Sequence, residues 1–336
     1  MYSEDDLAAA VDAGVLPAET ANAFRNFVAG RQNAPGVDEE HFRLVTGFND
    51  IFVVIACTLL LSAVGWIGST AGLWAGLLGV AGTAWGLAEF FVRKRRMALP
   101  AILLLLVFVG AVCGVVLSLL PSAAGPGIGG WRIAFAGAVS AIAAWLHWRR
   151  FQVPITVAAG AAAAVGCALG LLIAMVPAAR QWATLFSLVA GIAVFALALR
   201  WDAADTRRET RKSDVAFWLH LLAAPLLVHP AFAVLGLLDG DMGIAQAFAV
   251  LLLYVAIAAV SLSIDRRALM ASALAYVLYA FNALLEQYGV VSLGFALTAL
   301  VIGSALLLLS AFWHPSRAWV LGFLPPQVRE RLAPLK

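Results

Sequence analysis

The sequence predicts an all-α, polytopic membrane protein of about ten transmembrane helices, with both termini in the cytoplasm. Of its 336 residues, 63% are hydrophobic and 12% are charged, whereas a soluble domain has roughly 45–50% apolar and 25% charged residues. The apolar residues form continuous runs close to the ~20 needed to cross a bilayer, rather than the apolar–polar alternation of an outer-membrane barrel. These observations exclude a soluble globular protein.

The apolar runs define ten expected spans, which use most of the chain and leave short connections without room for a large soluble domain. Their approximate bounds are 50–69, 71–92, 99–120, 131–148, 153–176, 181–200, 215–238, 242–263, 268–286 and 290–312.

The distribution of Lys and Arg gives the orientation. With ten spans, 20 of the 22 basic residues fall on one side, and only Arg132 and Arg180 fall on the other. Because cytoplasmic connections carry the excess of Lys and Arg, both termini are predicted to be cytoplasmic. The small net charge of +3 therefore reports orientation in the lipid bilayer, and no nucleic-acid partner is expected.

The two ends of the chain differ from the apolar centre. Residues 1–46 have apolar side chains at helical spacing among acids, with Gly14 between two periodic stretches, which predicts a cytosolic helical hairpin. Residues 47–312 form the transmembrane bundle, and 313–336 form a cytosolic amphipathic tail suited to the inner membrane surface.

Three short motifs carry a family resemblance. They are Ala10-Val11-Asp12-Ala13-Gly14-Val15-Leu16 followed by Glu19-Thr20-Ala21, the Phe48-Asn49-Asp50 entry to the first span, and the ending Leu324-Pro325, Val328-Arg329 and Leu332. In these the chain resembles an uncharacterised family of bacterial multipass membrane proteins with a short soluble N-terminal helix pair. The resemblance implies a location in the bacterial inner membrane and no role for any particular residue.

Basic residues recur before alternate spans. Arg43, Arg95, Arg149, Arg211 and Arg266 are separated by 52, 54, 62 and 55 residues. Positive-inside topology alone produces such spacing. An internal repeat of helical hairpins, as in many transporters, is the other interpretation.

No motif indicates an enzyme, a cofactor or a metal site. Gly125-Pro126-Gly127-Ile128-Gly129-Gly130 matches a dinucleotide-binding pattern, but no strand precedes it. The five histidines are too dispersed to act as paired ligands. Glycine pairs one turn apart, such as Gly166 and Gly170, favour close helix packing.

Ionisable residues within spans are better candidates, because burying charge in hydrocarbon is costly. Glu89 lies four residues before Arg93, which predicts an ion pair along one helix. His220 and His229 lie in the seventh span together with Pro225 and Pro230, a pattern typical of a broken helix lining a cavity. Nine positions separate the histidines, so an ideal helix places them on opposite faces.

The ninth span contains the clearest polar stripe. All of its members fall within about 60° of Tyr279 at 100° per residue, and they face a cavity or neighbouring helices rather than lipid. The stripe consists of Ser272, Tyr276, Tyr279, Asn282 and Glu286, with Gln246 of the eighth span expected at a similar depth.

Two functions are compatible with these features. The first is transport of an unknown small solute or ion through a midplane cavity lined by the stripe and the broken seventh span, with Glu286 or His229 titrating. The alternative is a non-transporting membrane scaffold or sensor, which binds a protein partner through the N-terminal segment and the tail. Hydrogen bonding between neighbouring helices, without any cavity, also explains the polar stripe.

Overall fold

The computed structural model describes residues 4–24, 48–120, 128–206, 208, 210–234, 244–267, 270, 273–274, 277–278, 303–304, 312–329 and 332. The chain divides into two compact units, Met1–Leu44 and Val45–Lys336. In the first unit, α1 (Glu4–Asp12) is followed by Gly14 at a φ of 70° and by a helical stretch at 18–24. Glycine adopts this left-handed conformation at little cost, so it suits the turn between the two helical segments.

The second unit is helical throughout its described residues, as the apolar runs predict. In chain order, its first helices are α3 (Phe48–Ser69), α4 (Leu73–Ala88), η1 (Glu89–Lys94), α5 (Ala98–Leu119), α6 (Ile128–Phe151), α7 (Ile155–Met175), η2 (Pro177–Trp182), α8 (Ala183–Ala203), α9 (Arg211–Val234) and α10 (Ile244–Ile264). They are followed by α13 (Trp313–Gly322) and α14 (Pro326–Arg329).

Seven helical segments among the described residues are long and apolar enough to cross a membrane. They correspond to the first seven expected spans, and α10 corresponds to the eighth, with a shorter apolar stretch at Phe248–Ile264. The all-α polytopic class is therefore supported. The ninth and tenth spans, 268–286 and 290–312, fall almost entirely outside the described residues, so the count of ten stays a prediction.

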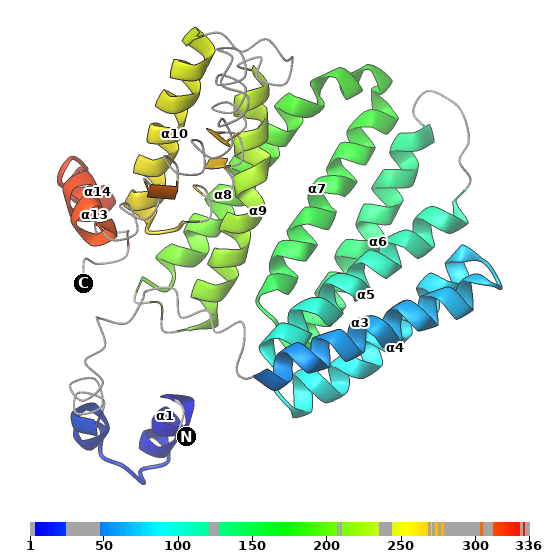
Figure 1. Ribbon diagram of the computed structural model, residues 1–336, viewed down its shortest axis with the longest axis horizontal. Coiled ribbons are helices and arrows are strands. Elements are labelled where there is room, and N and C mark those ends of the chain that lie inside the picture. The colour runs from blue at the N-terminus through cyan, green and yellow to red at the C-terminus, as the bar shows by residue number, and fades with distance from the viewer. Residues whose placement is uncertain are drawn as a thin grey trace. The chain divides into compact units, whose positions relative to one another are not determined.

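Helices adjacent in the chain pack as pairs. The most extensive contacts join α4 to α5, α6 to α7, and α8 to α9, while α7 also packs on α9. Figure 1 shows these pairs as neighbouring helices of opposite direction, each joined by a short connection. Side chains bring these connections to one end of the bundle: Glu89 contacts Arg150, and Trp218 packs beside Val153.

We call this end the basic end, because the connections there carry the Lys and Arg clusters. Arg266, after α10, reaches Asp202 at the end of α8, so the end of α10 belongs to it too. Arg132 instead bonds to the carbonyl of Leu117, at the opposite end of α5. The division of basic residues between two ends is thus present in the described part of the bundle, while the side of the membrane stays a prediction.

The connections at the basic end share an unusual backbone conformation. Arg96, Gln152, Arg208 and Asp265 have φ between 53° and 57° and are the only non-glycine residues with positive φ in the described chain. They are spaced 56, 56 and 57 residues apart. A side chain in the left-handed region costs about 1 kcal/mol or more, so its recurrence at one interval favours the internal-repeat interpretation.

Glycines set the distance between α6 and α7. A Cβ on Gly137 would lie 2.5 Å from the backbone nitrogen of Cys167, and a Cβ on Gly170 would lie 2.8 Å from both the Cα of Ala134 and the carbonyl oxygen of Gly130. Such distances require backbone-to-backbone contact, which small residues permit in membrane helices. Gly166, by contrast, faces open space.

The expected break in the seventh span is wrong, because α9 continues through both Pro225 and Pro230. A proline removes the hydrogen bond to the carbonyl four residues earlier. For Pro230 this carbonyl belongs to Leu226, and the hydroxyl of Ser187 on α8 donates to it at 3.3 Å. A Cβ on Gly191 would lie 2.9 Å from the Leu226 backbone, so α8 approaches closely enough to replace the lost bond.

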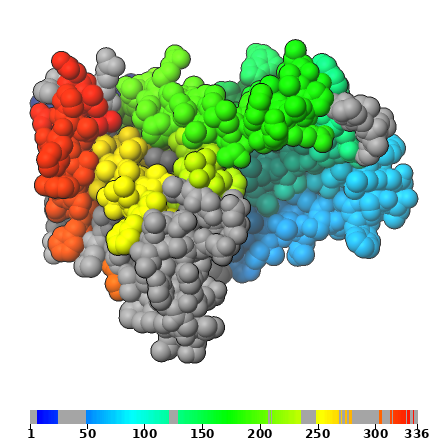
Figure 2. Space-filling view, turned by 90° about the horizontal axis from the view of Figure 1, so that it is seen from above, coloured from blue at the N-terminus to red at the C-terminus, as the bar shows by residue number. Residues whose placement is uncertain are grey.

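The helix α13 packs on α10. The two lie side by side in both views (Figures 1 and 2), with α13 in red and α10 in yellow. Leu332 packs against the cluster formed by Ala224 and Ile264. The described residues after 312 therefore return to the basic end and contact the bundle itself.

Candidate functional site

The structure describes only part of the predicted site. Gln246 belongs to α10, but its side chain lies outside the described residues. The whole polar stripe of the ninth span also lies outside them: Ser272, Tyr276, Tyr279, Asn282 and Glu286. The hypothesis that these side chains line a cavity stays a prediction.

The two histidines of α9 are separated as their nine-residue spacing predicts. His220 is completely buried, whereas His229 lies on the exposed surface of the helix. They do not share one site. The interior histidine of α9 is therefore His220.

His220 belongs to a group of charged side chains at the basic end. Its Nε2 lies 2.7 Å from Oδ2 of Asp202, at the end of α8. The other carboxylate oxygen of Asp202 accepts a hydrogen bond of 2.6 Å from Nη2 of Arg266. One carboxylate thus joins α8, α9 and the segment that follows α10.

The chain reverses sharply after α10, and this turn directs Arg266 into the bundle. Asp265 has a φ of 57° and ends the helix, so the next residue turns back toward α9. There Nη2 of Arg266 donates to the hydroxyl of Ser213 at 3.0 Å and to its carbonyl at 3.2 Å. The Ser261 hydroxyl donates to the Arg266 carbonyl, which fixes the reversed chain.

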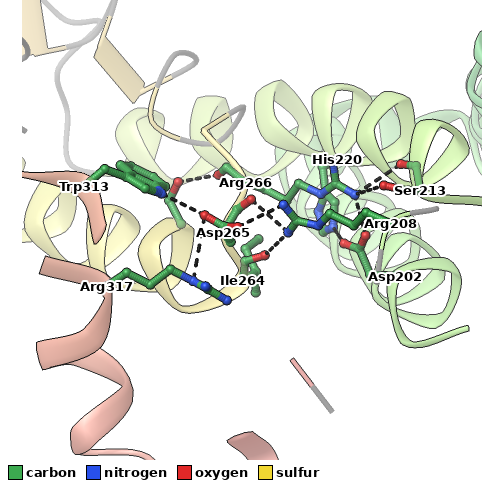
Figure 3. Close-up of polar contacts among 10 residues, drawn as sticks. Asp202, Arg208, Ser213, His220, Ile264, Asp265, Arg266, Trp313 and Arg317 are labelled. Carbon is green, nitrogen blue, oxygen red and sulfur yellow. Dashed lines mark hydrogen bonds and ion pairs between the residues drawn. The ribbon is translucent and has the colours of Figure 1, made fainter. Parts of the chain in front are cut away.

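A second carboxylate, that of Asp265, extends the group toward α13. Arg208 donates to Asp265 Oδ2 at 2.9 Å and to the carbonyl oxygens of Ile264 and Asp265 at 3.2 and 3.1 Å. The indole nitrogen of Trp313 donates to Asp265 Oδ1 at 2.7 Å, and Nε of Arg317 lies 3.8 Å from that oxygen. Figure 3 shows these side chains converging from separate helices.

We call this set the buried ion-pair cluster. Its members are Asp202, Arg208, Ser213, His220, Asp265, Arg266, Trp313 and Arg317. The side chains of Arg266 and Arg317 are 3% and 1% exposed. Transferring such charges from water costs several kcal/mol each unless they are paired, and here each of the three guanidinium groups lies within 4 Å of one of the two carboxylates.

Inside the cluster, Nδ1 of His220 and Nε of Arg266 have no hydrogen-bond partner among the described residues. The Nε2 of His220 is already used in the hydrogen bond with the Asp202 carboxylate, so Nδ1 is the ring nitrogen left for a further hydrogen bond. The cluster can therefore form a hydrogen bond with one more polar group at a buried position.

A cavity of about 520 Å³ adjoins the cluster. This volume lies in the usual range of small-molecule pockets, and the wall is mostly apolar with charged groups on one side. The lining residues are Leu199, Arg200, Asp202, Ala203, Asp205, Thr206, Arg208, Ile264, Gln327, Val328 and Leu332. Asp202 thus faces both the cavity and the interior of the bundle.

Sequence reasoning identified only His220 of this cluster. Asp202, Asp265 and Arg266 stand at the ends of expected spans, where charged residues are common, and Arg266 was used only for orientation. Two acidic positions next to span ends, Asp202 and Asp265, with a histidine inside a neighbouring span, were the available signal. The contacts between these residues depend on which helices pack together, and the residue pattern alone does not predict that pairing.

Comparison of the chain with protein-family models, with curated proteins and with solved structures finds no match.

Proposed function

We propose that this chain transports a small solute or ion across the bacterial inner membrane, and that the buried ion-pair cluster is its gate at the cytosolic end. The observation that carries the proposal is Asp202, whose carboxylate is shared by His220 and Arg266 beside a cavity. Ionisable residues within membrane helices are costly to bury and mark substrate pathways and proton relays.

The geometry supplies a way for such a gate to work. Asp202 ends α8, His220 belongs to α9, and Arg266 follows α10, so separation of these helices has to break the shared carboxylate contacts. Entry of a charged solute changes the balance of those contacts. A gate of this kind couples occupancy to helix movement without any covalent chemistry.

Cysteine accessibility tests the proposal without knowledge of the substrate. The three native cysteines are first replaced, and single cysteines are then placed at Thr206, Ala203 and Leu199, which line the cavity. Each purified variant is reconstituted into vesicles and treated with a membrane-impermeant thiol reagent. A permeation path predicts labelling at all three positions. Leu197, which is exposed on α8 and outside the cavity lining, is the matched control and should stay unlabelled within lipid.

The depth along α8 that the thiol reagent reaches distinguishes a permeation path from a closed bundle. A cysteine at Ala190, buried farther along α8, should react slowly if the helices open, and faster after the Asp202→Asn substitution loosens the gate. Glu89→Gln is the control, because it removes a carboxylate from the basic end that belongs neither to the cluster nor to the cavity lining. Labelling that stops at Leu199 in every variant would contradict transport through this part of the bundle.

A membrane scaffold or sensor is the second candidate. It is favoured by the separation of Met1–Leu44 from the rest of the chain as its own compact unit. Deletion of residues 1–46 tests it: loss of partner association from an intact bundle supports the scaffold, and unchanged association contradicts it.

A further inference from the structure

A second polar surface lies at the basic end, where α4 and α6 finish. Glu89 accepts hydrogen bonds from Arg150 Nε at 2.7 Å and Nη2 at 3.0 Å, and its Oε2 lies 3.4 Å from Arg93 Nη1. The ion pair predicted along the helix is confirmed, but the shorter contacts come from α6. The charge of Glu89 is thus largely satisfied by Arg150.

The remaining basic side chains around Glu89 have no such partner. Lys94, Arg95, Arg96 and Arg149 are exposed, and no carboxylate in the described part of the chain pairs with them. Together with Arg93 and Arg150 they form what we call the α4–α6 basic patch. A single carboxylate opposes six cations there, so the patch attracts anions.

Aromatic rings place this patch at the membrane surface. The guanidinium carbon of Arg95 lies 5.6 Å from the ring centre of Phe90, and that of Arg149 lies 4.9 Å from Trp145. Both rings are largely exposed, at 42% and 53%. Trp is enriched at headgroup level on the outer surface of membrane bundles, so Trp145 favours a position of the patch near lipid phosphates.

The last turn of α4 forms a pocket within the patch. In η1 the hydrogen bonds span five residues, as from the Arg95 amide to the Phe90 carbonyl, which widens the turn. A half-open cavity of about 510 Å³ is lined by Gly86, Glu89, Phe90, Arg93 and Lys94. Apart from its chain neighbours and the backbone of its own helix, no atom lies within 4 Å of the position that a Cβ on Gly86 would occupy, so the cavity surface formed by Gly86 is accessible.

We propose that this pocket binds the headgroup of an anionic phospholipid. The phosphodiester pairs with Arg93 and Lys94, and the acyl chains lie along the exposed face of Phe90 and the apolar surface of α4. Charge complementarity excludes a preference for a zwitterionic headgroup, because Glu89 is already occupied by Arg150. The apolar side of the pocket favours a lipid over a free phosphate.

Native mass spectrometry of the full chain in neutral detergent tests this site. Phosphatidylglycerol and phosphatidylcholine are titrated separately into wild type, Arg93→Gln/Lys94→Gln and a control, Arg211→Gln/Lys212→Gln. The control removes the same charge from exposed residues at the basic end, outside the pocket. Loss of two contacting cations should weaken phosphatidylglycerol binding about tenfold or more, with the control close to wild type.

The Glu89→Gln variant should bind phosphatidylglycerol more tightly, because it removes the carboxylate at the pocket rim and frees Arg150. Equal weakening by both double variants would overturn the proposal in favour of a general effect of net charge. Equal affinity for phosphatidylcholine, or displacement of the lipid by glycerol 3-phosphate, would also overturn it, the latter in favour of a soluble phosphate site.

Discussion

Substitution of Gly170 by alanine should separate α6 from α7. The added Cβ would lie 2.8 Å from the Ala134 Cα and the Gly130 carbonyl oxygen, and closer still to the Ala134 amide nitrogen. Ordinary contacts begin at 3.4 Å. All three obstacles are backbone atoms, so no rotamer change relieves them and the helices have to move apart by several tenths of an ångström.

The cost follows from the packing that such a movement disturbs. Overpacking of a well-packed interior typically costs about 1–3 kcal/mol, and α6 with α7 is the most extensive helix pair among the residues that the structure describes. Gly166→Ala is the matched control, four residues away on the same helix and facing open space. It should leave stability unchanged or raise it by less than about 1 kcal/mol, because alanine favours helix over glycine.

Thermal unfolding in detergent, followed with a thiol-reactive fluorophore, measures both variants. Cys57 is 3% exposed and reports loss of the packed core. The Gly170→Ala midpoint should fall by several degrees relative to Gly166→Ala. Ala134→Gly should not rescue it, since the Ala134 backbone remains. Equal midpoints for the two alanine variants, or rescue by Ala134→Gly, would refute the backbone-contact argument.

Three further substitutions test the polar interior. Asp202→Asn should destabilise the chain by about 3 kcal/mol in denaturant unfolding, because it leaves a buried arginine without its carboxylate; an unchanged midpoint would contradict the ion-pair geometry. Asp265→Ala should expose α13 to trypsin after Arg317, which is buried, while cleavage after the exposed Arg329 stays constant in peptide mapping; protection of both sites would show that other contacts hold the helix. His147→Phe should destabilise the chain by about 1–3 kcal/mol in the same unfolding assay, because it removes the imidazole nitrogen that lies 3.3 Å from the hydroxyl of the buried Thr156; an unchanged midpoint would show that this polar contact contributes little.

The seventh span shows where residue patterns mislead. Pro225 and Pro230 predict an interruption, because each removes a backbone donor. Whether the helix breaks depends on a neighbour that can satisfy the freed carbonyl, and Ser187 on α8 does so for Leu226. That contact spans 39 residues of sequence and has no local signature.

Glu89 shows the same limit from the other direction. Its partner one turn away, Arg93, is predictable from helical spacing alone. Arg150, which binds Glu89 at shorter distance, is 61 residues away and reaches it only because α4 and α6 end together. The predicted pair of Glu89 and Arg93 is present, but the packing of α4 beside α6 determines which further charges surround Glu89.

The sequence by itself determined the membrane class, the first eight helical segments and the division of basic residues, because hydrocarbon thickness and positive-inside charge act on composition and spacing along the chain. Only the tertiary structure decided that α9 stays continuous and that His220, rather than His229, is interior. It also decided that Asp202 joins His220 to Arg266. Those outcomes depend on which helices pair and in what register, and side chains distant in sequence acquire partners only through that packing.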